Sequence, residues 1–204
     1  MAFIISADDI KQTLPGYDPS HSDVLHSESA KLADKAYEKA LKTRSENTVV
    51  LMSGGSASGK TEYISAYLRN RKVIVLDGTL PTFDGAKIKI QKALKQNKKI
   101  EVHGVLPVDM KTAFIAFLNR DRKFPPEHFF RTHSSSRKTL LEIARNFPDI
   151  DVRIVFSKNP ISNNKVSMSF TKLWIPDRSF LIDFLSENQY TESELKRIQG
   201  LHDI

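Results

Sequence analysis

The sequence contains no cysteine among its 204 residues. Disulfide bonds and thiolate metal sites are therefore excluded, and this absence is typical of proteins from a reducing compartment. No apolar run reaches the length of about 18–20 residues that spans a bilayer. The first residues, MAFIISADD, lack the basic segment that begins a signal peptide and turn acidic early. We therefore expect a cytoplasmic protein that does not act in a membrane.

Internal repeats and low-complexity segments are also absent from the sequence. The apolar fraction of 40% and the charged fraction of 27% are ordinary for a globular protein of one-domain size. The alternation of helical and strand patterns weakens after Pro160. We therefore expect a main domain over residues 1–159 and an extension over residues 160–204 that packs on the same domain.

The chain is basic, with a formal net charge of +7. A positive balance favours anionic partners such as nucleotides, sugar nucleotides, nucleic acids or anionic lipids. The basic residues are spread along the chain, and the densest group, between Lys87 and Lys99, mostly avoids the apolar positions there. This pattern is typical of a solvated helix face, so nucleic acid is not the favoured partner.

Short apolar strands alternate with amphipathic helices along the chain. We expect strands at 2–6, 48–52, 73–76, 99–106 and 150–156. We expect helices at 27–42, from the glycine-rich loop to 69, and at 84–96, 109–120 and 136–146, with a proline-bearing linker before the last one. Two short strands and two short helices, from Arg178 and Thr191, follow. This order predicts an α/β fold with a mainly parallel sheet flanked by helices.

The stretch GGSASGKT predicts a phosphate-binding loop. Gly54, Gly59, Lys60 and Thr61 satisfy the pattern G-x-x-x-x-G-K-[ST], directly after an apolar strand and at the start of a helix. Glycines let backbone N–H groups surround a phosphate, the lysine reaches the β- and γ-phosphates, and the threonine hydroxyl ligates Mg²⁺. The predicted nucleotide-binding residues are Gly54, Gly55, Ser56, Ala57, Ser58, Gly59, Lys60 and Thr61. The alternative is a glycine-serine turn before a helix.

A second candidate site, an acidic residue, follows the next strand in VIVLDGT. A strand that ends in Asp77 delivers a carboxylate beside the phosphate loop, where it can hold Mg²⁺, directly or through water, or orient a substrate. The alternative for Asp77 is a turn-forming residue before a glycine.

Together these stretches resemble the zeta-toxin-type P-loop kinases over residues 3–158. The resemblance is carried by the phosphate loop, by LDGTL, by KIKIQKALKQNKKIEVHGVLP and by RDRKFPPEHFFRTH. It implies a P-loop NTPase fold and transfer of the γ-phosphate of ATP or GTP to a hydroxyl. For well-known members the acceptor is UDP-N-acetylglucosamine, and a protein antitoxin is an implied partner.

The resemblance also implies a position for the catalytic base. Members carry it as the second acid of an Asp-x-Asp element followed by x-x-Lys, and in ISADDIK that position falls on Asp8, with Lys11 three residues later. Ser6 stands where the first acid is expected. This strand and its helix precede the phosphate loop here, as in a circular permutation, so the 73–76 strand is expected to lie between the 2–6 and 48–52 strands.

Arginines and histidines cluster around the prolines at 125 and 126. By resemblance Arg122, three residues before the first of these prolines, is the best match to the family's phosphate-neutralising arginine. Arg120, Arg131 and Arg137 are further candidates, and surface arginines are the alternative. His128 and His133 are placed in the same loop without acidic partners for a metal. THSSS is read as a helix-capping run, and Trp174 and Phe170 as packing or base-stacking residues.

The combined interpretation is a P-loop kinase that transfers phosphate from ATP or GTP, with Mg²⁺, to a small-molecule hydroxyl. Its catalytic residues would be Asp8, Lys60, Asp77 and Arg122, with Thr61 and Asp77 at the metal. One alternative is a kinase acting on polynucleotide ends, which the basic charge suggests. Another is a nucleotide-binding interaction module without catalytic acids, for which Ser6 is the warning sign.

Overall fold

The computed structural model describes residues 1–158, 168–173 and 175–200. Its strands are β1 (Phe3–Ser6), β2 (Thr48–Ser53), β3 (Ile74–Asp77), β4 (Lys99–Pro107), β5 (Asp151–Lys158) and β6 (Ser169–Leu173). Its helices are α1 (Ala7–Gln12), η1 (Pro19–His21), α2 (His26–Thr43), α3 (Lys60–Tyr63), η2 (Ile64–Leu68), α4 (Phe83–Leu94), α5 (Met110–Leu118), α6 (Pro126–Asn146), α7 (Arg178–Glu187) and α8 (Glu192–Ile198).

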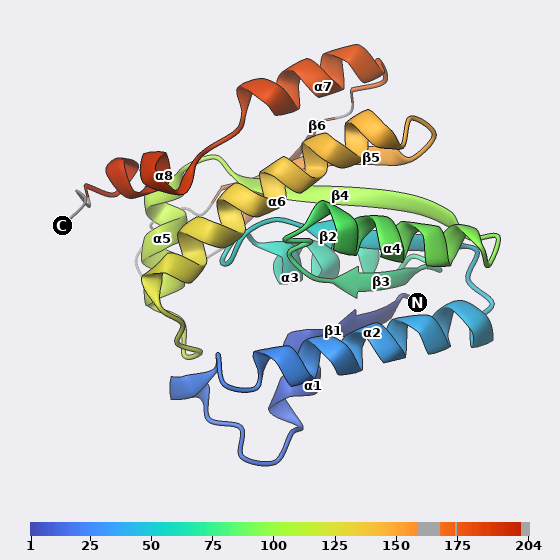
Figure 1. Cartoon of the computed structure of the whole chain (residues 1–204), viewed down its shortest axis with the longest axis horizontal. Helices are drawn as coiled ribbons and strands as arrows, with labels where there is room; N and C mark the ends of the chain where they lie inside the picture. The colour runs from blue at the N-terminus through green and yellow to red at the C-terminus, as the bar shows by residue number, and fades with distance from the viewer. Residues whose placement is uncertain (159–167, 174, 201–204) are drawn as a thin grey trace.

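The strands form one sheet in the order β1-β3-β2-β4-β5-β6 (Figure 1). All neighbours pair in parallel except β6, which runs antiparallel to β5. The predicted α/β class with a mainly parallel sheet is therefore confirmed. The expected position of the 73–76 strand is confirmed as well, because β3 lies between β1 and the phosphate-loop strand β2.

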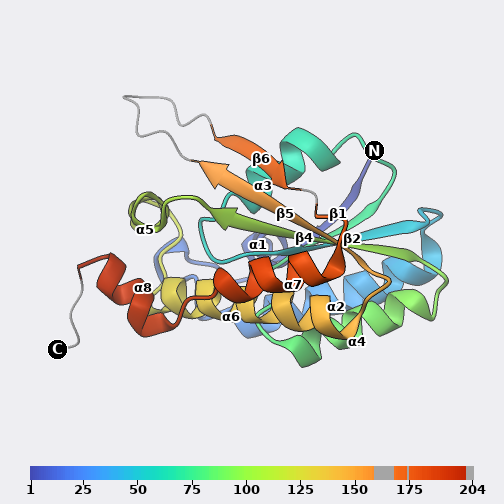
Figure 2. The ribbon, with the colours of Figure 1, turned by 90° about the horizontal axis from the view of Figure 1, so that it is seen from above.

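The two faces of the sheet are covered unequally. Helices α2, α4, α6 and α7 lie on one face, and α3 with η2 lies on the other (Figure 2). The larger core joins Leu51, Val102 and Ile154 of the sheet to Tyr37 of α2 and Leu181 of α7. Helix α7, from the part of the chain after residue 160, thus shares the main core. The domain boundary predicted at residues 159–160 lies outside the described residues. No helix in the described ranges combines the length and apolarity needed to cross a membrane.

A buried polar chain holds the phosphate-loop helix on its side of the sheet. The hydroxyl of Tyr63 lies 3.2 Å from Nδ1 of His103, and Nε2 of His103 lies 3.0 Å from the Glu101 carboxylate. Arg71 donates two hydrogen bonds to the same carboxylate, at 2.9 and 2.7 Å. Burying such groups is favourable only when they are paired, so these contacts fix the end of α3 relative to β4.

The helix α6 begins at Pro126, which corrects the predicted start at Ser136. Proline fits the first turn of a helix, where its missing N–H has no intrahelical partner. The expected apolar periodicity is interrupted because polar Thr132, His133 and Ser136 occupy buried positions. His128 and His133 therefore lie on a helix and not in a loop, and THSSS is helix interior instead of a capping run.

The chain after Ser6 turns at once into the short helix α1. Ser6 is the N-cap residue, and its hydroxyl accepts a hydrogen bond from the Asp9 N–H at 3.2 Å. The serine at this position therefore has a structural role as a helix cap. Asp8 thus sits in the first turn of α1, directly after the edge strand.

Candidate active site

The phosphate loop connects β2 to α3 at the carboxyl end of the sheet. Ala57 and Gly59 have positive φ angles of 58° and 88°, which turn successive N–H groups toward the inside of the loop. Nζ of Lys60 donates to the carbonyl oxygens of Gly54 and Gly55, both at 2.8 Å, and lies 3.4 Å from Oγ of Ser58. The loop therefore encloses the lysine in the way that the sequence motif predicts.

Two buried residues of α6 hold the outer side of the loop. Nε2 of His133 donates to the Ser56 carbonyl at 2.8 Å, and the Ser56 N–H donates to Oγ1 of Thr132 at 3.1 Å. Burial lowers the pKa of His133 to about 3, so the ring stays neutral and keeps its role as a single donor. Sequence reasoning missed this clamp, because it placed His133 in a loop.

Gly55 is required by this packing, and we expect Gly55→Ala to destabilise the protein by about 1–3 kcal/mol. A β-carbon at Gly55 would lie 2.3 Å from the ring of His133, which is itself buried and cannot move away. Gly78→Ala is the matched control, because nothing lies within 4 Å of a β-carbon there. Urea unfolding of both variants checks this expectation, and equal stabilities would contradict the clamp.

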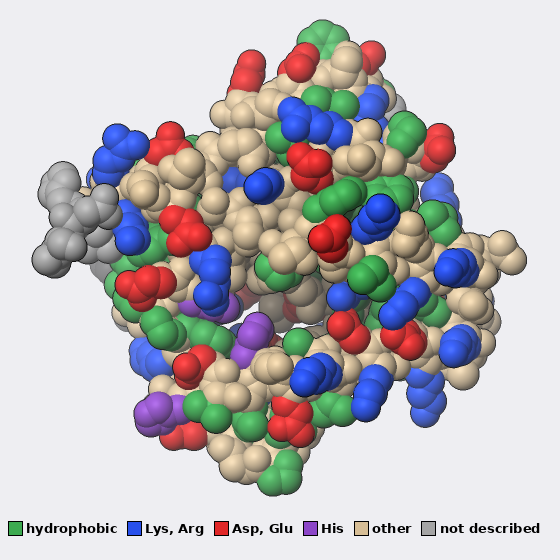
Figure 3. All heavy atoms as spheres, in the orientation of Figure 1, with side chains coloured by type: hydrophobic (Ala, Val, Ile, Leu, Met, Phe, Trp, Pro, Cys, Tyr) green, Lys and Arg blue, Asp and Glu red, His purple; other side chains and the backbone are tan. Residues whose placement is uncertain are grey.

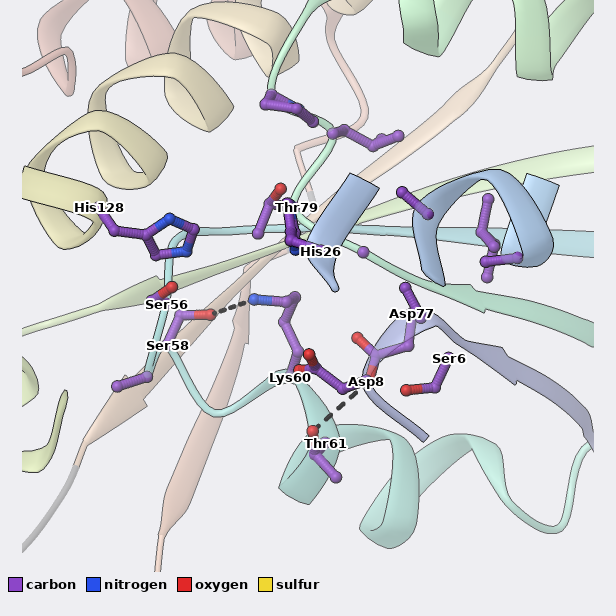
Figure 4. A pocket seen from close by; sticks show the side chains of 18 of the residues that line it. Ser6, Asp8, His26, Ser56, Ser58, Lys60, Thr61, Asp77, Thr79 and His128 are labelled. Atoms are coloured by element: carbon purple, nitrogen blue, oxygen red, sulfur yellow. Dashed lines mark hydrogen bonds between the residues drawn. The ribbon is translucent and has the colours of Figure 1, made fainter. Parts of the chain in front are cut away.

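Thr61 and Asp77 meet beside the lysine. The Thr61 hydroxyl lies 3.5 Å from Oδ2 of Asp77 (dashed in Figure 4). Burial raises the pKa of Asp77, with Lys60 opposing the shift, and burial lowers the pKa of Lys60 to about 8, with Asp77 opposing. A partly buried carboxylate beside a hydroxyl is a donor set that fits Mg²⁺, which prefers oxygen ligands and takes few of them from protein. Within the described ranges no cluster of three or more His, Cys, Asp or Glu residues forms a metal site.

Asp8 reaches the same site from the edge strand. The register of β1 and β3 sets Ser6 beside Asp77, and parallel strands bring their carboxyl ends to one edge of the sheet. Figure 4 shows Ser6, Asp8, Asp77, Lys60 and Thr61 gathered there. Asp8 and Lys60 line a single cavity of about 290 Å³.

Cations surround the carboxylate of Asp8. Nη1 of Arg122 lies 2.7 Å from one carboxylate oxygen, and Nζ of the buried Lys11 lies 3.5 Å from the other. Burial acts to raise the pKa of Asp8, but Arg122, Lys11 and Arg120 outweigh it and hold the pKa below its usual value. Asp8 is therefore ionised at neutral pH, which is the form that accepts a proton.

The two arginines of the α5–α6 loop, residues 119–125, have different surroundings. Both line the cavity. Arg122 is engaged by Asp8, whereas the guanidinium of Arg120 forms no salt bridge or hydrogen bond in the described part of the chain. The pKa of Arg120 is lowered by burial and by the neighbouring charge of Arg122, with Asp8, Glu62 and Asp77 opposing. Arg120 is thus a partly buried cation of the cavity that is not held in an ion pair.

The other predicted residues are distributed around and away from the cavity. His26 and His128 line it, and histidine side chains border the hollow seen in Figure 3. Arg137 is buried against Tyr190, which places it in the structural core and not at the site. Phe170 packs against Tyr63 and Tyr67, in agreement with the packing role considered for it, and Trp174 lies outside the described residues.

Comparison with known proteins finds a similarity in structure but none in sequence family. No family model matches the chain, and no curated protein matches its sequence. Among solved structures, it is similar to a chain in the crystal structure of the AvrRxo1-ORF1:-ORF2 complex, with a TM-score of 0.46 and 12% sequence identity. The match covers 79% of this chain and 72% of that chain. At this degree of likeness, function must be inferred from the residues of this chain's own site.

Proposed function

We propose that this protein is a phosphotransferase that moves the γ-phosphate of ATP or GTP to a hydroxyl of a small molecule. One observation carries the proposal: a phosphate loop and the ionised carboxylate of Asp8, at the start of α1, line the same cavity. A phosphate loop alone is compatible with simple nucleotide binding. A carboxylate placed across the cavity from it adds the group that a kinase needs to accept the proton of the attacking hydroxyl.

Each residue of the site then has a positioning or electrostatic role. Backbone N–H groups of residues 54–61 and the Lys60 ammonium bind the phosphates. Thr61 and Asp77 hold Mg²⁺, which supplies further neutralisation of phosphate charge. Asp8 accepts the proton of the acceptor, and Lys11 and Arg122 hold its carboxylate in place. Phosphoryl transfer requires little covalent participation from a protein, so these roles account for most of the catalysis.

Arg120 is the arginine that we assign to the transferring phosphoryl group, in place of Arg122. A cation without a partner is available for developing negative charge, whereas Arg122 is already bound to Asp8. We expect Arg120→Ala to lower kcat about 100- to 1000-fold. Steady-state kinetics checks this, and an unchanged kcat in Arg120→Ala would contradict the assignment.

Arg122→Ala should instead change the pH profile. Arg122 lowers the pKa of Asp8, so its removal raises that pKa, and the carboxylate becomes protonated at a higher pH. We therefore expect the acid limb of kcat/KM to move to higher pH. The comparison is the pH profile of the unchanged protein, and Arg122→Lys should restore part of the shift. Coincident profiles for all three proteins would rule out this role.

The experiment that tests the function is incubation with Mg²⁺, ATP or GTP labelled at the γ-phosphate, and a panel of acceptors. The panel contains nucleosides, sugars, sugar nucleotides including UDP-N-acetylglucosamine, and oligonucleotides. Transfer of label to a small molecule supports the proposal. Label found only on oligonucleotides would favour a polynucleotide kinase, with binding that falls steeply with salt. Nucleotide binding without transfer to any acceptor would favour an interaction module. A protein antitoxin stays a prediction of the family resemblance.

A further inference from the structure

The cavity extends beyond Asp8 into a compartment between α2 and α4, which we call the acceptor compartment. Small residues form its walls: Ala30 and Ala33 on α2, and Gly85 and Ala86 on α4. Short side chains on two packed helices leave room for a flat or compact ring. The cavity as a whole is about 290 Å³, near the lower end of the roughly 300–1,000 Å³ typical of ligand sites. Part of that volume adjoins the phosphate loop, so the compartment suits a small compound and not a polymer.

Aromatic rings close the outer side of this compartment. Phe124 stacks on His128 with 4.4 Å between the ring centroids, and His26 meets Phe124 edge-on at 6.2 Å. Burial lowers the pKa of His128 to about 4 and also lowers the pKa of His26. Both rings are therefore neutral at pH 7, and they present apolar faces and single hydrogen-bond donors to a ligand.

The charged residues of the cavity are largely paired with one another. Lys89 of α4 lies 2.9 Å from the Asp34 carboxylate of α2, at the inner end of the acceptor compartment. Arg122 is paired with Asp8, at 2.7 Å. The remaining cations that line the cavity are Lys60, which the phosphate loop encloses, and Arg120, which we assign to the transferring phosphoryl group. With Lys60 and Arg120 assigned to the donor phosphates, every other cation of the described residues that lines the cavity is paired with a carboxylate.

We propose that the acceptor is an uncharged hydroxyl compound of monosaccharide to nucleoside size, and not a phosphorylated or diphosphate-bearing one. This inference rests on the proposed phosphotransferase function and specifies its substrate class. An anionic acceptor would have to displace Asp8 from Arg122 or Asp34 from Lys89, or else lie against those carboxylates without a counter-charge. Leaving a charge unpaired in a partly desolvated site is costly, and like charges in contact discriminate strongly against a ligand. A neutral ring compound meets apolar walls and polar donors with both ion pairs intact.

The test compares neutral acceptors with their phosphorylated counterparts: uridine with UMP and with UDP-N-acetylglucosamine, and glucose with glucose phosphate. Transfer of labelled phosphate gives kcat/KM for each compound, and titration calorimetry, with and without a non-hydrolysable ATP analogue, gives its affinity. We expect at least one neutral member to exceed its phosphorylated counterpart about tenfold or more in both measurements. A preference for the anionic members, or no binding of any neutral member, would overturn the proposal. Calorimetry measures the binding preference even if no phosphate is transferred. Absence of transfer would count against the proposed phosphotransferase function and not against the preference for neutral compounds.

A pair of variants tests the cause of the preference. Asp34→Asn leaves Lys89 without its partner, so the neutral-to-anionic ratio of affinities should fall about tenfold. Glu38→Gln is the matched control, because Glu38 pairs with Lys92 across the same two helices but does not line the cavity. Its ratio should equal that of the unchanged protein. Equal ratios in Asp34→Asn and Glu38→Gln would show that the ion pair does not set acceptor charge.

Discussion

Lys60→Ala is expected to abolish phosphate transfer while the protein remains folded. The lysine ammonium is the cation enclosed by the phosphate loop, where charge on the transferring phosphoryl group develops. Removing such a preorganised charge costs about 3–4 kcal/mol of transition-state stabilisation, or roughly 100- to 1000-fold in kcat. Its hydrogen bonds to two carbonyls are each worth only about 1 kcal/mol, so the fold is retained. Single-turnover assays and urea unfolding measure the two effects separately.

The matched control for this variant is Lys72→Ala. Lys72 is exposed and lies outside the cavity, but its loss changes the net charge of the protein equally. Any effect of overall charge on nucleotide encounter would therefore appear in both variants. If Lys60→Ala turned over nucleotide as fast as Lys72→Ala, the glycine-rich segment would not be a phosphate-binding loop.

Asp8→Asn is expected to lose transfer to the acceptor and to keep its affinity for nucleotide. In the proposed reaction the carboxylate acts on the acceptor hydroxyl, so its loss should remove general-base catalysis worth about 100- to 10,000-fold. The phosphates are held by other residues, so equilibrium binding of ATP should change little. Acceptor-dependent single-turnover rates and ATP titrations give the two quantities.

Asp9→Asn serves as the control, because Asp9 is the exposed neighbour of Asp8 on α1 and does not line the cavity. It should behave as the unchanged protein in both measurements. Equal losses of nucleotide affinity and of transfer in Asp8→Asn would instead place Asp8 at the nucleotide. Unchanged transfer would leave the cavity without an identified base.

The sheet and the phosphate loop could be predicted because their signals are local. Buried strands such as β2 and β3 are short apolar runs, and the loop motif lies within eight residues after one of them. The place of β1 could be inferred from family resemblance, since only that resemblance links ISADD to the strand end at Asp77. Spacing within the chain gives no information on which distant strands pair.

Other parts of the site are formed by contacts between distant residues and leave no local signal. The pairs Asp8–Arg122 and Asp34–Lys89 each join segments that the sequence separates widely. The start of α6 was missed for a related reason. Its buried residues Thr132 and His133 bind the phosphate loop, and polar residues at buried positions hide helical periodicity.

The edge position of β1 has a consequence for the order in which the protein is assembled. In the described sheet β1 pairs with β3 alone, so β1 has no strand partner there until residue 77 has been made. The ion pair of Asp8 can form only after Arg122 has been made. The neighbouring Lys123 N–H, in the same α5–α6 loop, donates to the carbonyl of Pro19. Contacts between residues so distant in sequence form slowly, because each closes a long stretch of chain. We therefore expect the contacts that hold Asp8 in place to form late in folding, after the parallel pairing of β2 with β3.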